Sequence, residues 1–229
     1  MFLSFISQKG GTGKSTLALH IAAIAATQGH NTLLIDADPQ ASAMAWYACR
    51  VKNGHPAIPN LTVTAINNGT ITGQMAELSK AYDFVVIDGP PRGDLIARDV
   101  ILASNIVLVP TQLSGFDVWA GDSITKTIEE LRPIQELAAK QPLDWFYVVN
   151  KKDPRTLAGK TILKALENST DHVLETHICA RASFVESTSQ GLTILETEPA
   201  RSRARREIEA LAEQITLLIT RRQQERAAA

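Results

Sequence analysis

The residues Lys9-Gly10-Gly11-Thr12-Gly13-Lys14-Ser15-Thr16 decide the fold of this 229-residue chain. They follow a short apolar run, Phe2 to Ile6, and they lead into an Ala- and Leu-rich stretch from Ser15 to Gln28. Glycines allow backbone N–H groups to converge on phosphate oxygens, and a helix that follows adds its N-terminal dipole. A strand, a glycine loop and a helix in this order therefore predict a phosphate-binding loop.

Two lysines and a serine give this loop its chemistry. Lys14 is expected to reach the β- and γ-phosphates of a nucleotide, and the Ser15 hydroxyl suits Mg²⁺. The usual pattern GxxxxGK[ST] is not met in full, because Gln8 takes the place of its first glycine. A second lysine, Lys9, stands directly before the glycine pair instead. A chance glycine turn is the alternative, which the strand–loop–helix context disfavours.

The rest of the chain repeats a short apolar run, a polar turn and a longer amphipathic stretch. Continuous β-branched runs separated by helices are typical of parallel strands covered on both faces. Right-handed crossovers place helices on both sides of such a sheet. The sequence predicts one α/β domain over 1–229, with a mostly parallel central sheet. Strands are expected at 2–6, 32–35, 61–66, 84–87, 106–109, 145–149 and 173–178. Helices are expected at 15–28, 41–52, 95–103, 116–140, 156–168 and 204–222.

Carboxylates follow two of these strands. In a sheet of this kind ligands bind beyond the carboxyl ends of the strands. Asp36-Ala37-Asp38-Pro39-Gln40 comes after the second strand, and Asp88-Gly89-Pro90-Pro91 after the fourth. Asp38 is expected either to orient the attacking water beside the γ-phosphate or merely to cap the next helix. Asp88 ends a buried run, where a phosphate site holds its Mg²⁺.

Composition excludes several classes of protein. A net charge of -1 and a pI near 6.5 argue against a globally basic nucleic-acid binder, so any such surface must be a local patch. Cys49 and Cys179 are far apart and form no CxxC spacing, which predicts neither a disulfide framework nor a zinc site. Neither a signal peptide nor an apolar run of the ~20 residues needed to span a bilayer is present. A cytoplasmic protein is expected.

The glycine loop, the segment Asp36 to Gln40 and the run Phe84 to Pro91 together resemble the ParA/MinD group of deviant Walker A ATPases. Within it, the chain is similar to the short ParA partition ATPases, and the likeness extends to 107–111, 116–120 and 191–196. The resemblance implies a P-loop NTPase fold and hydrolysis of ATP to ADP and phosphate with Mg²⁺. It also implies an ATP-bound homodimer in which Lys9 reaches the partner's phosphates.

The resemblance assigns roles at the matching positions. Lys9, Lys14 and Asp38 would be catalytic, with Asp38 positioning the water. The metal would be held by Ser15, Asp36 and Asp88, the last acting through water. The nucleotide would be bound by Lys9, Gly10, Gly11, Thr12, Gly13, Lys14, Ser15, Thr16 and Asn150, with Asn150 near the adenine. Asn150 also fits a simpler role, since Asn at a strand end often stabilises a turn.

Basic residues crowd the approach to the last helix, and a second basic stretch lies at 151–164. Charge alone leaves a solvated helix face as an equal alternative, because Glu207 and Glu209 follow at once. The resemblance implies non-specific DNA binding by the ATP dimer through C-terminal basic residues, with no base reading. It therefore favours, as phosphate contacts, Arg181, Arg203, Arg205 and Arg206, with Lys160 and Lys164 as a further possibility.

The resemblance implies a positioning switch. Dimers with ATP would coat the nucleoid, and a ParB-like adaptor on a plasmid, a chromosome origin or a protein organelle would stimulate hydrolysis and release. No N-terminal helix-turn-helix domain is expected, and so no operator binding. Apolar residues at helical spacing in the last helix favour packing on the core over a MinD-like membrane anchor. A metabolic ligase or synthetase is the main alternative. An iron–sulfur reductase is disfavoured, because no Cys follows the strand that ends at Asp88.

Overall fold

A single parallel sheet organises the protein. The structure, a computed structural model, describes residues 1–68, 70–91, 95–113, 115–139, 142–153 and 155–228. Six strands pair in parallel in the order β3-β2-β4-β1-β5-β6, so the predicted α/β fold with a parallel central sheet is confirmed. The strands are β1 (Phe2–Ser7), β2 (Thr32–Asp36), β3 (Leu61–Ala65), β4 (Phe84–Pro91), β5 (Ile106–Thr111) and β6 (Asp144–Val149).

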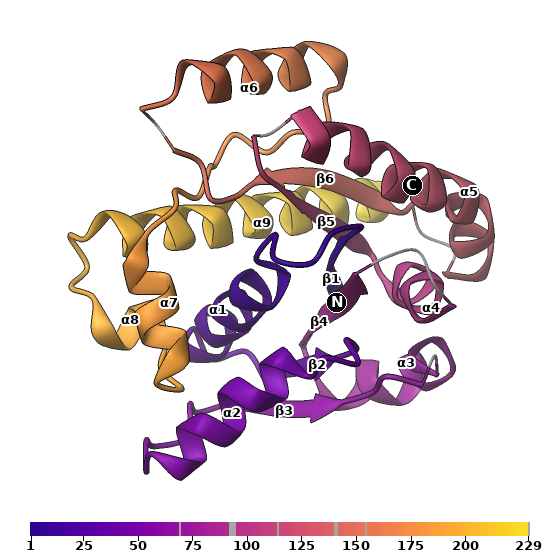
Figure 1. Ribbon diagram of the computed structural model, residues 1–229. Coiled ribbons are helices and arrows are strands. Elements are labelled where there is room, and N and C mark those ends of the chain that lie inside the picture. Colours follow the sequence, from indigo (N-terminus) through magenta and orange to yellow (C-terminus); the bar gives the residue numbers. More distant parts are fainter. Residues whose placement is uncertain (69, 92–94, 114, 140–141, 154, 229) are drawn as a thin grey trace.

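Helices cover both faces of this sheet, as predicted (Figure 1). One face carries α1 (Lys14–Thr27), α2 (Ser42–Lys52), α7 (Ala182–Ser189), α8 (Ile194–Thr197) and α9 (Arg203–Ala228). The other carries α3 (Ile71–Ala81), α4 (Leu95–Ala103), α5 (Gly115–Ala139) and α6 (Leu157–Ser169).

The central strands are buried on both sides. Successive side chains of a strand point to opposite faces. In β1, Leu3 and Phe5 enter the core beneath α1 and α9, whereas Phe2 and Ile6 enter the core beneath α4 and α5. All four are buried, which is why the strands read as continuous apolar runs rather than as alternating ones.

The last helix is part of the core, as its apolar spacing predicted. Ile208, Leu211 and Ile215 of α9 are buried in the cluster that also holds α1. Near the end of α9, the buried Arg222 guanidinium donates to the Asn105 carbonyl at 2.8 Å and to the Asp144 carboxylate at 2.6 Å. Both acceptors lie where β5 and β6 begin, so α9 is fastened at the end of the sheet opposite the glycine loop.

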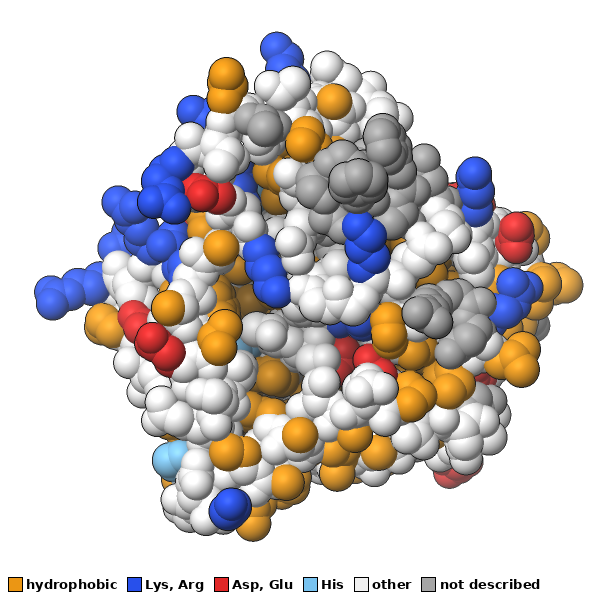
Figure 2. Space-filling view, in the orientation of Figure 1, with side chains coloured by type: hydrophobic (Ala, Val, Ile, Leu, Met, Phe, Trp, Pro, Cys, Tyr) orange, Lys and Arg blue, Asp and Glu red, His pale blue; other side chains and the backbone are white. Residues whose placement is uncertain are grey.

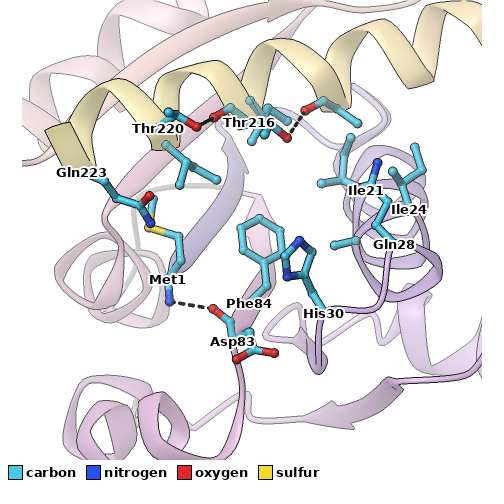
Figure 3. Close-up of a pocket in the computed structure, with 14 residues that line it drawn as sticks. Met1, Ile21, Ile24, Gln28, His30, Asp83, Phe84, Thr216, Thr220 and Gln223 are labelled. Carbon is cyan, nitrogen blue, oxygen red and sulfur yellow. Dashed lines mark hydrogen bonds between the residues drawn. The ribbon is translucent and has the colours of Figure 1, made fainter.

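A pocket of about 380 Å³ lies between α1 and α9 at this same end of the sheet (Figure 3). Ile21 and Ile24 of α1, Phe84 of β4 and Ile215 and Thr216 of α9 are among its lining residues. The first helix therefore has the glycine loop at its beginning and, at its end, a pocket lined by both apolar and polar side chains.

Some predicted elements differ from the structure. The strand expected at 173–178 is wrong: this segment forms no continuous ladder with the edge strand β6, and its contacts with the sheet include one isolated bridge, Tyr147–Val173, with a second bridge, Lys152–Cys179, just beyond both segments. Between them, the Thr176 N–H donates to the side chain of Gln214 on α9 at 3.0 Å instead of continuing a ladder. Helices α3, α7 and α8 were not predicted. The predicted helix 116–140 is confirmed as α5, although Lys140 lies outside the described residues.

Candidate functional site

The glycine loop leaves the carboxyl end of β1, between β4 and β5 in the sheet. Gly11 and Gly13 have φ angles of 79° and 94°. This left-handed region is costly for residues with a Cβ, so glycine is favoured at both positions. Helix α1 begins directly after Gly13, at Lys14. The loop therefore turns sharply onto the N-terminus of a helix, as the sequence predicts.

Neighbouring side chains hold the carbonyl oxygens of the loop. Ser7 donates to the Lys9 carbonyl at 2.8 Å, Asn150 donates to that of Thr12 at 2.7 Å, and Lys151 donates to that of Gly11 at 2.5 Å. The C=O and N–H of one trans peptide point in opposite directions. The N–H groups that follow, those of residues 10, 12 and 13, therefore point away from these partners. Such a set of N–H groups suits an anion.

Lys14 lies beneath this loop among carboxylates. It is buried, and burial lowers the pKa of its ammonium, although the charges of Asp88 and Asp38 act in the opposite direction. A buried cation needs anionic neighbours. Without a ligand, the two aspartates offset the positive charge of Lys14, and phosphate oxygens of a bound ligand would offset it further.

Asp88, in β4, is fully buried, and neither of its carboxylate oxygens has a hydrogen-bond partner among the described residues. Burial raises its pKa to about 7, and the nearby Asp36 charge acts in the same direction. The Ser15 hydroxyl is close enough to lower this pKa, but it does not meet the geometry of a hydrogen bond. Buried carboxylate oxygens without donors are available to a water or a cation.

Asp36 and Asp38 leave the end of β2 and behave differently. The Asp36 carboxylate accepts from the N–H groups of Asp38 at 3.2 Å and Met44 at 2.9 Å, so it holds the turn into α2. Burial raises the pKa of Asp36 in spite of these bonds. Asp38 accepts from the Gln40 N–H at 2.9 Å through one oxygen and lines an open pocket with the other residues of this turn. Asp38 thus stabilises the turn before α2 without capping that helix, and it also lies at the site.

Two pockets flank the glycine loop. The first, of about 640 Å³, is lined by Lys9, Asp38, Pro39 and Pro91 among others, so it joins the loop to the ends of β2 and β4. The second, of about 420 Å³, lies on the other side of α1's beginning and is lined by Asn150, Cys179, Arg181 and Phe184 among others. Phosphates on the loop would thus have a pocket on either side of them.

Magnesium fits this donor set only together with a ligand. Within the described part of the chain, no group of three or more His, Cys, Asp or Glu side chains could hold a metal ion alone. Of the three predicted ligands, the Ser15 hydroxyl and the orphaned Asp88 oxygens are available, whereas both Asp36 oxygens already accept backbone N–H groups. Mg²⁺ prefers six oxygens and usually takes several from water and substrate phosphates. The residues therefore suit a cation that arrives with a nucleotide.

The predicted arginines separate into two groups. Arg181 pairs with Glu207 at 2.5 Å, and Arg205 pairs with Glu209 at 2.8 Å, so both guanidinium groups are held within the chain. Arg203 and Arg206 are exposed on the first turns of α9. Figure 2 shows Lys and Arg side chains gathered along the left edge of the molecule, beside the beginning of α9.

The structure thus brings the predicted loop, Lys14, Asp36, Asp38 and Asp88 to one edge of the sheet, and Asn150 beside the loop. Sequence reasoning missed two residues that follow β5 and β6: Gln112 and Lys151 both donate to the Gly11 carbonyl. The rule that ligands bind at strand ends could have found them. It also missed the segment 178–182, which lines the second pocket and carries no motif.

No helix in the described ranges combines the length and apolar character that a membrane crossing requires.

Comparisons with known proteins agree with this geometry. A family model described as the CobQ/CobB/MinD/ParA nucleotide binding domain matches residues 3–194. The maintenance of carboxysome distribution protein A of Halothiobacillus neapolitanus is 29% identical over 196 residues, which are 85% of this chain and 86% of that protein. The chromosome-partitioning ATPase Soj of Thermus thermophilus is 26% identical, over 86% of this chain and 88% of its own.

Solved structures show the same fold. The ATP complex of a McdA variant from Cyanothece superposes with a TM-score of 0.73 at 17% identity, covering 94% of this chain and 96% of its own. Cobyrinic acid a,c-diamide synthase from Mycobacterium smegmatis, with bound ADP and magnesium, gives 0.64 at 20% identity, covering 82% and 92%.

Proposed function

Because this chain belongs to the CobQ/CobB/MinD/ParA nucleotide-binding family, we propose that it is an ATPase that positions a cargo in the cell. Its substrates would be ATP with Mg²⁺ and water, and its products ADP and phosphate. The observation that carries the proposal is the buried Lys14 at the end of the glycine loop, with the Asp38 and Asp88 carboxylates near it and Asp36 near Asp88.

Each side chain of the set has a task that its surroundings support. Lys14, buried beneath the loop, would neutralise the β- and γ-phosphates, where a preorganised cation is most effective. Ser15 and Asp88 would hold Mg²⁺, which stabilises the charge that develops on the phosphates. Asp38 lines the pocket on the γ-phosphate side and would orient the attacking water. Asn150, which holds the Thr12 carbonyl beside the second pocket, would lie near the base.

Lys9 supports the proposal that ATP joins two subunits. It lines the same pocket as Asp38, at the open mouth of the site rather than beneath it. In a face-to-face homodimer, this lysine would reach the phosphates of the partner subunit, and each site would be complete only in the dimer. Hydrolysis would then separate the subunits.

The exposed arginines of α9 support DNA binding by that dimer. Arg203 and Arg206 would contact phosphates of any sequence, and the dimer would double the number of such contacts, favouring nucleoid association when ATP is bound. Lys160 and Lys164, exposed on α6, would be an alternative surface. A ParB-like adaptor on the cargo would stimulate hydrolysis and release. The similarity to a carboxysome distribution protein and to Soj makes a protein organelle and a chromosome origin the cargoes to test first.

The deciding experiment measures ATP hydrolysis by the purified chain alone, with random-sequence duplex DNA, and with DNA plus a candidate adaptor. Stimulation that requires both additions supports the positioning function. Turnover that ignores DNA but depends on a small carboxylic acid would favour a ligase or synthetase, to which the chain is similar in fold. Absence of any ATP hydrolysis under all these conditions would contradict both functions.

A further inference from the structure

Glu207 joins the last helix to one wall of the second pocket. It lies in α9, one residue after Arg206, and its side chain is only 18% exposed. Oε2 accepts from the Cys179 N–H at 3.0 Å and from Arg181 Nε at 3.1 Å, and Oε1 accepts from Arg181 Nη2 at 2.5 Å. One carboxylate thus receives three hydrogen bonds from a segment that lines the pocket.

The wall at residues 178–181 lies outside the strands and helices of the described chain, so other elements must hold it. The Ile178 N–H donates to the carbonyl of Val149, the last residue of β6, at 2.9 Å, and the Ala180 N–H donates to that of Lys152, in the loop after β6, at 3.0 Å. The Cys179 N–H, between them, points the other way, because alternate peptides of an extended chain face opposite sides. Glu207 accepts a hydrogen bond from this N–H. The segment is therefore held on one side by β6 and on the other by α9.

Arg181 extends the wall to the start of α7. It is the residue that precedes this helix, and its guanidinium meets Glu207 through two donors. A two-point contact between a guanidinium and a carboxylate fixes orientation as well as distance. Burial alone would raise the pKa of Glu207, but the bonds from Arg181 and Cys179 outweigh it and lower that pKa. The carboxylate is thus held in its charged form, as the contact requires.

We propose that Glu207 is a positioning residue for the nucleotide base: it fixes the wall formed by Cys179 and Arg181, against which the base packs. This inference rests on the proposed function, because it takes the occupant of the second pocket to be the base of ATP. The three hydrogen bonds that define this role all come from Cys179 and Arg181, and none of the three comes from the glycine loop. Replacing Glu207 should therefore weaken binding of the base and leave binding of the phosphates unchanged.

The test compares two ligands that share phosphates but not a base. Dissociation constants for ATP and for inorganic tripolyphosphate are measured by calorimetry, each with Mg²⁺, on wild type, Glu207→Gln and Glu209→Gln. Glu209→Gln is the matched control, because it removes the same charge from the same helix but breaks a pair with Arg205. Glu207→Gln is expected to weaken ATP about fivefold, the effect of losing roughly 1 kcal/mol of a partly buried ion pair. Tripolyphosphate should bind unchanged.

Each other outcome has a definite meaning. Equal weakening of both ligands, or an effect matched by Glu209→Gln, overturns the positioning role, because the change then acts on the whole fold. If wild type binds tripolyphosphate as tightly as ATP, the pocket takes no base and the inference fails. If wild type binds neither ligand, the proposed function itself fails. Should Glu207→Gln not fold, Arg181→Lys, which keeps the charge but not the two-point contact, carries the same expectation.

Discussion

Gly13 and Asn150 approach each other so closely that a Cβ on Gly13 would lie 2.2 Å from Nδ2 of Asn150. That nitrogen donates to the Thr12 carbonyl, the neighbour of Gly13 in the loop. The side chain at the end of β6 therefore occupies the space that any larger residue at position 13 would need. The shape of the glycine loop is set by a residue far along the chain.

Gly13→Ala should therefore destabilise the protein before any ligand is added. The left-handed φ of 94° and the contact with Asn150 together should cost about 1–3 kcal/mol. Urea denaturation without nucleotide measures this. Gly10→Ala is the control from the same loop, since a Cβ there would meet nothing within 4 Å. Equal stability of the two variants would contradict the close packing described here.

Lys14→Ala should abolish ATP binding or reduce hydrolysis by at least about 10²-fold, because a buried ammonium is lost from a preorganised anion site. Lys9→Ala is the informative companion, since Lys9 lines the open pocket rather than the base of the loop. It should leave ATP binding by the monomer intact and impair hydrolysis by the dimer. Normal turnover by a folded Lys14→Ala protein would exclude this loop as the active site.

Asp38→Ala should bind ATP but stall before hydrolysis, which would accumulate the dimer. Size-exclusion chromatography with ATP, together with phosphate release, measures both properties. Asp38→Asn separates charge from structure, because the amide oxygen still accepts from the Gln40 N–H. If catalysis needs the carboxylate, both variants should stall alike. Wild-type turnover in Asp38→Asn would reduce Asp38 to the cap of a turn.

DNA binding should require ATP and should depend on Arg203 and Arg206 but not on Arg205. The first two are exposed, whereas Arg205 donates to Glu209 and to the carbonyls of Leu195 and Glu198. Replacing Arg203 and Arg206 by Ala should weaken binding to all sequences. It should also reduce the log–log salt slope by about 0.9 for each DNA phosphate that the variant no longer neutralises. Titrations on random duplexes at several salt concentrations test this. A larger effect from Arg205→Ala would reverse the assignment.

His20 should make stability depend on pH. It is fully buried in α1, where it bonds with the Thr16 carbonyl at 2.6 Å and accepts from the Ile194 N–H at 3.0 Å. Burial lowers its pKa to about 4 from 6.5. Between these values the unfolded chain binds more protons than the folded one, so stability falls as pH falls from 6.5 to 4. The total loss from this group should be about 3 kcal/mol.

The control for this pH effect is His20→Gln, which keeps a hydrogen-bonding side chain but cannot titrate. As pH falls toward 4, wild type should lose more unfolding free energy than His20→Gln does, so its stability relative to the variant should decrease. Urea denaturation at pH 7, 6, 5 and 4.5 measures it. A difference that stays constant across this range would show that His20 titrates normally in the folded protein.

Much of this site could be predicted because its residues are local in sequence. The glycine loop and the aspartates follow strands that an apolar run identifies, so their meeting at one sheet edge follows from the fold alone. Asn150 could be placed beside the loop in the same way. The sequence could not show that Arg181 is paired with Glu207, since that pair depends on how α9 packs. The Arg205–Glu209 pair lies within α9 at a spacing of four residues, so the helical pattern could have indicated it. The sequence pattern near Thr176 predicted a strand, but the Thr176 N–H donates to the side chain of Gln214 on α9 and not to a neighbouring strand.

The packing of α9 on α1 also sets an order of events during synthesis. The buried face of α1 is covered by Ile208, Leu211 and Ile215, which lie far later in the sequence and therefore leave the ribosome long after α1 does. At a synthesis rate of ~5–20 residues per second, the buried face of α1 stays exposed for on the order of ten seconds or more before α9 is made. The nascent chain therefore carries its phosphate loop on an incompletely covered helix until α9 has been synthesised, and this interval is when chaperones would bind it.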